Sequence, residues 1–430
     1  MDFLNKVIDL NLKFSIKMKI IAPIVLLVIS SLIILKTSNI EKSYLFESQL
    51  KWALLGAILF FMIFYVKIDF LYKNSNLFYL FIIILFIATM FFGFEINNSQ
   101  RWISFGFFSF QPSEIGKLFF VLFVARYLSD RPKSKYGFHT ILLLFLPTFI
   151  TFILILQQPD LGTSLVYLFI IFPMMYWAGI KPLDILLSIS PFVSFLIAFT
   201  YEFSLSSELV KLNETYFFIL FFIWIISISI ILVFKYRFRL NNYVIALIIT
   251  ANLLITTFTK IFLDKLMLSY WFKRIIAFLD PFTYRNDFAY QINSSYDAIG
   301  SGGFFGKGLG RGMLTEFKMM PIYESDFIVS ALAEQIGFVG ILALIICLFY
   351  FFYWFITYLE KSINKFEQLI LIGFGSIWFF HSFVNLCIVS GIFPVTGLPF
   401  PFLSYGGTSL MANCIMLSIA NRVISKHISN

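Results

Sequence analysis

The sequence predicts an all-α polytopic integral membrane protein with about twelve transmembrane helices. Of its 430 residues, 60% are hydrophobic and only 13% are charged, and the mean hydropathy is +0.89. A soluble domain carries about 25% charged residues. Apolar runs close to the ~20 residues needed to cross a bilayer recur along the whole chain. Together these observations exclude a soluble globular protein.

The apolar runs define the elements in order. The first begins near Ile20 and lacks a small-residue cleavage site, so we expect a retained helix rather than a signal peptide. The tenth is long enough to tilt, kink or extend beyond the membrane. The expected spans are 20–36, 52–69, 76–93, 113–128, 139–157, 161–178, 183–199, 216–234, 243–263, 326–357, 366–390 and 403–423.

Lys and Arg in the short connections indicate the orientation, because cytoplasmic loops are enriched in both. They gather at the two chain ends and in the even-numbered connections, whereas the opposite short loops contain few. We therefore expect both termini in the cytoplasm, and we expect 94–112, 157–160, 264–325 and 391–402 outside. The cytoplasmic charges are Lys6, Lys13, Lys17, Lys19, Lys67, Lys73, Arg126, Arg131, Lys133, Lys135, Lys181, Lys235, Arg237, Arg239, Lys361, Lys365, Arg422 and Lys426.

We expect a single transmembrane domain, 1–430, with 94–112 as an outer loop. Residues 264–325 should form a large extracytoplasmic loop, in which 264–279 alternates basic and apolar residues like a helix lying on the outer leaflet. The net charge of +9 is explained better by the Lys and Arg of the cytoplasmic loops than by binding of nucleic acid. The three cysteines fall in apolar runs and suggest no disulfide: Cys347, Cys387 and Cys414.

Several polar motifs stand at the expected outer face. They are RWI (101–103) with FQPSEIGK (110–117), QPDLGT (158–163), AIGSGGFFGKGLG (298–310), SDFI (325–328) with AEQIGFVG (333–340), and PVTGLP (394–399) with PFLSYGG (401–407). In this order, from about Arg101 to Leu410, they resemble the SEDS family (shape, elongation, division and sporulation), the RodA and FtsW proteins. The FSFQPSE and GIFPVTGLP forms look more like the RodA branch.

The resemblance implies a peptidoglycan glycosyltransferase that polymerises lipid II into glycan strands outside the bacterial cytoplasmic membrane during cell elongation. It implies a class B penicillin-binding protein and other cell-elongation proteins as partners. Family members usually have ten spans, so 216–263 is expected to be an additional two-helix insertion. Ser325 stands where the family commonly has Thr, and Glu324 where a basic residue or His is frequent.

Asp326 matches the family's catalytic Asp. The ordinary interpretation of a carboxylate at the first turn of a helix is a cap for free N–H groups. The resemblance favours a general base instead, which would take the proton of an acceptor sugar hydroxyl. A diphosphate is already a good leaving group, so the general acid of a two-carboxylate glycosidase is unnecessary.

The other candidates are expected to bind substrate. Arg101 is expected to bind a diphosphate. Lys117 has three interpretations: it binds the diphosphate too, it extends outward to the membrane surface, or it pairs with Glu114 at i,i+3. Trp102 is an interfacial belt residue or stacks on a sugar. The resulting substrate-binding set is Arg101, Trp102, Glu114, Lys117, Asp160, Lys307 and Ser404.

Four positions keep two interpretations. Asp160 is a helix cap or a ligand for a sugar hydroxyl or a cation. Glu334 is a buried structural group or part of the site. His381 is more simply a satisfied core residue. The glycine run 300–310 is a mobile connector, or a lid whose amides approach an anion; it is not a P-loop, because the GK[ST] ending is missing.

Two other functional classes stay open. A lipid II flippase or another polytopic transporter should place ionisable residues near the bilayer midplane, whereas these candidates lie at the outer surface. A non-catalytic scaffold for a synthase should tolerate Asp326→Asn. No cofactor is required by the sequence, although a divalent cation, Mg²⁺ or Mn²⁺, could bridge a diphosphate to Asp160 or Glu114.

Overall fold

The computed structural model describes most of the chain, and the chain divides into two compact units. The first comprises Met1–Pro132, Leu144–Ala178 and Gln291–Asn430; the second comprises Lys133–Leu143 and Gly179–Tyr290. The described residues are 2–37, 43–96, 99–104, 106, 109–132, 138–206, 222, 224–226, 228–229, 248–256, 258–259, 270–285, 287, 289–312, 323–362 and 364–428.

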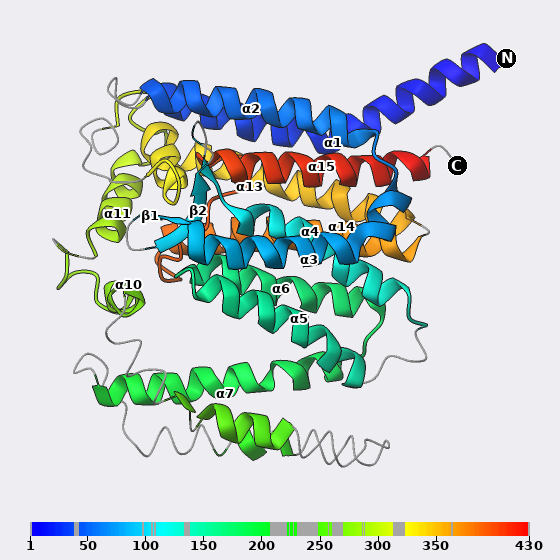
Figure 1. Cartoon of the computed structure of the whole chain (residues 1–430). Coiled ribbons are helices and arrows are strands. Elements are labelled where there is room, and N and C mark those ends of the chain that lie inside the picture. Colours follow the sequence, from blue (N-terminus) through cyan, green and yellow to red (C-terminus); the bar gives the residue numbers. More distant parts are fainter. Residues whose placement is uncertain are drawn as a thin grey trace. The chain divides into compact units, whose positions relative to one another are not determined.

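The first unit is a bundle of long helices. Figure 1 places the start of α1 and the end of α15 at one end of this bundle and the strands β1 and β2 at the other. Its helices are α1 (Asp2–Thr37), α2 (Ser43–Phe64), α3 (Ile68–Phe92), α4 (Pro112–Ser129), most of α5 (Phe138–Leu156), α6 (Leu161–Ala178), all but the first residue of α11 (Tyr290–Gly302), α13 (Ile328–Lys361), α14 (Lys365–Val389) and α15 (Gly407–Ile428).

Among the described residues, eight helices are long and apolar enough to cross a membrane. This confirms a polytopic helical protein but does not confirm twelve spans. The expected spans 113–128 and 403–423 are the helices α4 and α15, which are not among the eight. Polar side chains lie near both ends of α4 and along the whole of α15. The expected spans 216–234 and 243–263 lie largely outside the described residues.

Several helix ends differ from the expected spans. The second span, expected at 52–69, is Ser43–Phe64, and the third begins at Ile68 rather than at 76. The twelfth begins at Gly407 rather than at 403. Hydropathy locates the apolar centre of a span, whereas a helix ends where its backbone hydrogen bonds end.

The segment 94–112, expected to be an outer loop, contains a small antiparallel sheet, which the all-α expectation missed. Its strands are β1 (Phe94–Ile96), β2 (Ser99–Ser104) and β3 (Ser109–Phe110), in the order β1-β2-β3. Trp102 is paired with Phe94, and Ile103 with Phe110. Arg101 and Trp102 follow one another on β2, so their side chains leave opposite faces of the strand.

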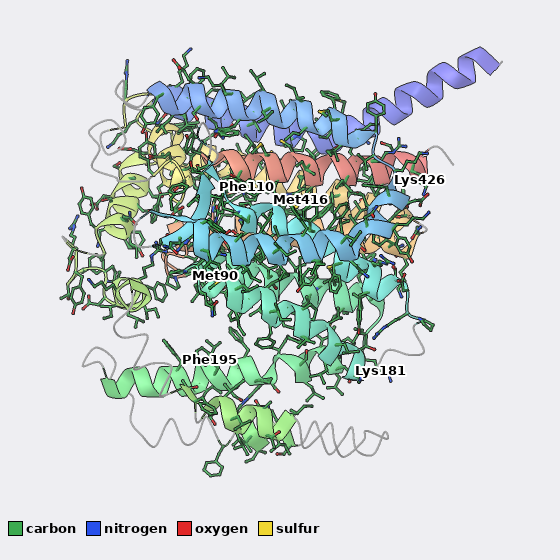
Figure 2. The ribbon with its side chains drawn as sticks, viewed as in Figure 1. Met90, Phe110, Lys181, Phe195, Met416 and Lys426 are labelled. Carbon is green, nitrogen blue, oxygen red and sulfur yellow. The ribbon has the colours of Figure 1, made fainter. Side chains whose placement is uncertain are left out.

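The helix α14 lies at the centre of the first unit. Its apolar stretch is 72% buried, whereas that of α2 is 11% buried and faces the surroundings. It contacts α4, α6, α13 and α15. Figure 2 shows Phe110 toward the sheet end of the unit and Lys426 at the other end, where its Nζ lies 2.8 Å from Glu367 Oε1.

The second unit contains α7 (Pro182–Ser206) and α10 (Tyr270–Leu279). The described part of the expected insertion packs on α7 through polar side chains: Trp224 Nε1 donates to Ser194 Oγ at 2.7 Å, and Asn252 Nδ2 donates to Ser190 Oγ at 3.1 Å. The helix α10 is the second part of the expected interfacial helix, whose residues 264–269 lie outside the described part.

Candidate functional site

Asp326, the expected catalytic residue, lies in a turn before α13. The helix begins at Ile328 and its N-cap residue is Phe327, so Asp326 precedes the cap rather than occupying the first helical turn. The residue is half-buried. Ser325 Oγ donates a hydrogen bond to Asp326 Oδ1 at 2.9 Å. The carboxylate is therefore carried by a turn, whose shape depends on its neighbours.

Two backbone carbonyls of this turn are held by the segment that leads into α15. Ser404 Oγ donates to the carbonyl of Ser325 at 2.5 Å, and the amide of Tyr405 donates to the carbonyl of Glu324 at 2.8 Å. Ser404 Oγ also accepts a hydrogen bond from the amide of Phe400 at 2.8 Å. The hydroxyl that was expected to bind substrate thus joins two backbone segments.

A third contact with the turn comes from α14. Asn385 Nδ2 donates to the carbonyl of Asp326 and to the carbonyl of Leu398, both at 2.9 Å. Asn385 is fully buried. Asn385 was not among the residues expected from the sequence, where its signal is an amide inside a mostly apolar span.

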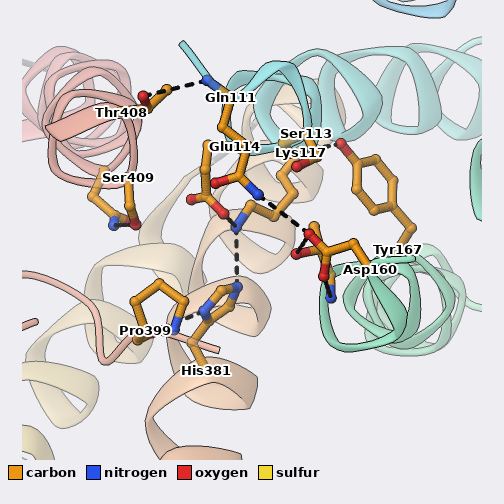
Figure 3. A network of polar contacts seen from close by, with 12 residues as sticks. Gln111, Ser113, Glu114, Lys117, Asp160, Tyr167, His381, Pro399, Thr408 and Ser409 are labelled. Atoms are coloured by element: carbon orange, nitrogen blue, oxygen red, sulfur yellow. Dashed lines mark hydrogen bonds and ion pairs between the residues drawn. The ribbon is translucent and has the colours of Figure 1, made fainter. Parts of the chain in front are cut away.

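Lys117 is enclosed by protein (Figure 3). Its Nζ lies 2.8 Å from Glu114 Oε1 and 3.1 Å from His381 Nε2, and the side chains of Lys117 and Glu114 are only 2% and 3% exposed. The expectation that Lys117 snorkels outward is therefore wrong, and its pairing with Glu114 is confirmed. Because α4 packs against α3, α6 and α14, the ammonium meets a buried carboxylate instead of water.

His381 joins Lys117 to the segment before α15. Its Nδ1 lies 3.1 Å from the carbonyl of Pro399, which can only accept, so Nδ1 carries the proton. Nε2 of the neutral ring then accepts from Lys117 Nζ. His381 is a satisfied core residue, as expected, and it also contacts a predicted substrate-binding residue.

Arg101 and Asp160 form a second charged pair. Arg101 NH1 lies 3.7 Å from Asp160 Oδ1, Arg101 Nε donates to the carbonyl of Gln158 at 3.2 Å, and a terminal nitrogen donates to the carbonyl of Pro159. Asp160 also accepts from the amide and the hydroxyl of Thr163, at 3.1 and 2.9 Å. The helix-cap interpretation of Asp160 is thus confirmed, and Arg101 holds the turn that precedes α6.

Gln111 connects this pair to α15. Its Nε2 donates to Asp160 Oδ2 at 3.2 Å, and its backbone amide donates to Thr408 Oγ1 at 3.4 Å (Figure 3). Thr408 Oγ1 in turn donates to the carbonyl of Ser109 at 3.3 Å. The starts of α4, α6 and α15 are therefore held together at the sheet end of the unit.

The helix α14 contacts both halves of the site. His381 and Asn385 are four residues apart, so they lie on one face of the helix, about 6 Å apart along its axis. One contacts Lys117 and the other contacts Asp326, and both bind the carbonyls of the 398–399 segment. The predicted cation and the predicted base are thus supported by a shared framework.

The glycine run is fixed against α13 instead of being a mobile connector. The amides of Lys307 and Gly308 donate to the carbonyls of Glu334 and Gln335, at 2.9 and 3.0 Å. At 3.6 Å, Lys307 Nζ also pairs with Glu334 Oε1, whose side chain is fully buried. Lys307, expected to bind substrate, holds the loop to the helix in this structure.

The structure does not bring every expected site residue together with the others. Trp102 is half-buried on β2, opposite Phe94, and Lys307 contacts Glu334 at a separate place on α13. Within the described residues, no group of three or more His, Cys, Asp or Glu side chains could hold a metal ion. Asp160 and Glu114, the carboxylates considered for a cation, are paired with Arg101 and Lys117.

The chain matches one family model over nearly its full length. The model, FTSW_RODA_SPOVE, is described as "Cell cycle protein" and matches residues 11–217 and 220–428. The chain is 30% identical over 399 residues to "Peptidoglycan glycosyltransferase RodA" of Treponema pallidum (strain Nichols), covering 89% of this chain and 90% of that one. It is 28% identical over 405 residues to "Probable peptidoglycan glycosyltransferase FtsW" of Taylorella equigenitalis (strain MCE9), covering 90% of each.

The fold is similar to those of solved structures. One is a chain of a solved structure described as "Structural coordination of polymerization and crosslinking by a peptidoglycan synthase complex". It superposes on this chain with a TM-score of 0.68 at 22% identity, covering 96% of this chain and 98% of that one. The rod shape determining protein RodA of Thermus thermophilus superposes with a TM-score of 0.59 at 21% identity, covering 95% and 96%.

Proposed function

This chain belongs to the SEDS family of peptidoglycan glycosyltransferases, and we propose that it polymerises lipid II on the outer face of the cytoplasmic membrane, with Asp326 as the general base. The observation that carries this proposal is the support of the Asp326 turn. Asn385 and Ser404 bind the carbonyls of Asp326 and Ser325, while Asp326 itself stays half-buried at the sheet end of the bundle. A base must be held in place and must still reach a substrate.

In the proposed reaction, Asp326 takes the proton of the acceptor sugar hydroxyl. The oxygen then attacks the anomeric carbon of the polymer-linked donor. A new glycosidic C–O bond forms as the bond between that carbon and the diphosphate oxygen breaks. The polyprenyl diphosphate leaves with the bonding electrons, and the proton stays on Asp326 until it is released to water.

Arg101 and Lys117 are the proposed diphosphate partners. Both are paired with carboxylates, Asp160 and Glu114, at 3.7 and 2.8 Å. A diphosphate oxygen that binds Lys117 must therefore compete with Glu114. In return, the buried ammonium of Lys117 lies in a water-poor surrounding, where a cation stabilises the negative charge of a leaving group more strongly than it would in water.

We assign the chain to cell elongation, with a class B penicillin-binding protein as partner. The FSFQPSE and GIFPVTGLP segments support the RodA branch, although named relatives of both branches have comparable identity. A similar solved chain comes from a peptidoglycan synthase complex, which supports a partner that supplies crosslinking. Depletion should produce rounded cells, whereas filamentous cells would assign the chain to division.

The proposal is tested by polymerisation of purified lipid II by the full chain in detergent, with its partner transpeptidase, comparing wild type with Asp326→Asn. Asn keeps the size of the side chain and removes its basicity. The rate should fall by roughly 10²-fold or more, the scale of lost acid–base catalysis. A folded Asp326→Asn protein that polymerises at the wild-type rate would overturn the mechanism.

Asp69→Asn is the matched control. Asp69 is exposed in the first turn of α3, at the end of the bundle opposite the sheet. Its substitution makes the same chemical change away from the site and should leave the rate unchanged. Transport of lipid II by a wild-type protein that forms no polymer would favour a transporter instead.

A further inference from the structure

The helix α13 is broken at Gly337, and the break divides it into two parts with different surroundings. Gly337 has φ 74 and ψ −163, which is not helical. Every residue from Ile328 to Gln335 is buried in protein. After the break, side chains such as Phe338, Leu342 and Phe349 are exposed, as on a surface that faces lipid.

The glycine-rich loop supplies the hydrogen bonds that the break removes. The amides of Phe338 and Val339 donate to the carbonyls of Gly303 and Phe304, at 3.0 and 3.2 Å. In the opposite direction, the carbonyls of Glu334 and Gln335 accept from loop amides at 2.9 and 3.0 Å. Irregular backbone is compatible with an apolar surrounding only when its polar groups are satisfied, and the loop satisfies these four backbone groups of α13.

The depth of the break follows from the antiparallel pairing of α13 with α1. At one end of the pair, Lys19 Nζ lies 3.7 Å from the centre of the Trp354 ring; at the other, Thr37 Oγ1 donates to Gln335 Oε1 at 2.9 Å. The 20-residue span Met18–Thr37 is about 30 Å long at ~1.5 Å per residue. That length matches the hydrocarbon thickness of about 30 Å, so Gln335 and the break stand at its edge.

The loop presents aromatic side chains at this depth. Phe305 is 78% exposed and Phe304 is 59% exposed. The ring centre of Phe304 lies 4.9 Å from that of Phe305 and 5.6 Å from that of Phe338, which is itself on the lipid-facing part of α13. The exposed aromatic surface therefore continues without interruption from the helix onto the loop.

We propose that residues 303–309 form a membrane anchor, with Phe304, Phe305 and Leu309 inserted among the acyl chains of the leaflet at the sheet end of the bundle. Under the proposed topology this is the outer leaflet. Lys307 is then kept beside the apolar side chains by its ion pair with Glu334, which neutralises an ammonium at the membrane edge. Part of the expected extracytoplasmic loop thus lies in lipid, and this inference is independent of the enzymatic mechanism.

The anchor is tested with nitroxide labels on the full chain in lipid nanodiscs. Cys347, Cys387 and Cys414 are replaced by Ala, and a single cysteine is introduced by Phe305→Cys. Power saturation then compares collisions with molecular oxygen, which concentrates in acyl chains, with collisions with a water-soluble nickel chelate. Leu342→Cys on α13 is the lipid control, and the exposed Gln100→Cys on β2 is the water control.

The label at position 305 should collide more with oxygen than with the chelate. The label at position 342 should behave in the same way, whereas the label at position 100 should collide more with the chelate. A preference for the chelate would place the loop in water, and protection from both reagents would place it under protein; either result overturns the anchor. Leu309→Cys provides a second site on the loop, because Leu309 is also exposed and makes none of the aromatic contacts.

Discussion

The side-chain amide of Asn385 donates a hydrogen bond to the backbone carbonyl of Asp326, with an N···O distance of 2.9 Å. The same nitrogen binds the carbonyl of Leu398, also at 2.9 Å. One buried amide thus ties the turn that carries the proposed base to the segment leading into α15. The position of the carboxylate depends on a residue 59 positions away in the chain.

Asn385→Ala should lower both the polymerisation rate and the stability, and the loss of rate should exceed what the loss of folded protein explains. It leaves two backbone carbonyls without their side-chain donor, at about 1–3 kcal/mol for each that stays unsatisfied, and it releases the turn. Initial rates and thermal unfolding are measured together. Asn413→Ala is the control, since Asn413 is buried and accepts from Trp378 Nε1 at 2.9 Å, away from the turn. Equal effects of both variants on the rate would make Asn385 a purely structural residue.

His381→Leu should raise KM for lipid II, because Lys117 Nζ loses the acceptor that lies 3.1 Å away. His381→Gln should restore part of the affinity, since its amide oxygen can accept. Substrate titrations separate KM from kcat for both variants. His139→Leu is the control, because His139 is exposed at the start of α5. If Leu and Gln at 381 have the same KM, the contact with Lys117 does not orient the ammonium.

Asp160 should tolerate Asn better than Ala. Asn is a comparable N-cap, so Asp160→Asn can keep the bond to the amide of Thr163, whereas Asp160→Ala loses the cap at about 0.5–2 kcal/mol. Thermal unfolding measures the difference. Indistinguishable unfolding of the two variants would mean that the ion pair with Arg101, lost in both, dominates.

Arg101→Ala should weaken lipid II use more than Arg422→Ala at the opposite end of the bundle.

Gly337→Ala should destabilise the protein by about 1–3 kcal/mol, because alanine must adopt a positive φ there and its Cβ would collide with the amide of Gly306. Gly300→Ala is the matched control: a Cβ at Gly300, inside α11, meets nothing within 4 Å. Unfolding midpoints are compared in the same detergent. A Gly337→Ala protein as stable as Gly300→Ala would show that the break in α13 is not required.

The orientation is tested by a single cysteine at Ser301→Cys, in a chain without Cys347, Cys387 and Cys414. Ser301 is exposed in the last turn of α11, at the sheet end of the first unit. An impermeant thiol reagent should label it in intact cells. Labelling that appears only after lysis would reverse the proposed topology.

The sequence by itself determined the membrane class, since apolar runs of bilayer length need no tertiary information to be seen. It also put forward two local contacts among its alternatives, Glu114 with Lys117 at i,i+3 and Asp160 as the cap of α6, because helix geometry limits which neighbours can meet. The structure then selected both. The motif order from 101 to 410 identified the family and the residue to test, Asp326.

Only the tertiary structure decided which distant groups meet. The contacts of His381 with Lys117, of Asn385 with Asp326, and of the glycine loop with the broken α13 join residues far apart in the chain or in different elements. Hydrophobic periodicity could not predict them, because buried spans such as α14 are apolar on most sides and do not reveal which face meets which neighbour. Packing is what brings a single histidine or asparagine in such a span opposite the one charge or carbonyl that it can satisfy.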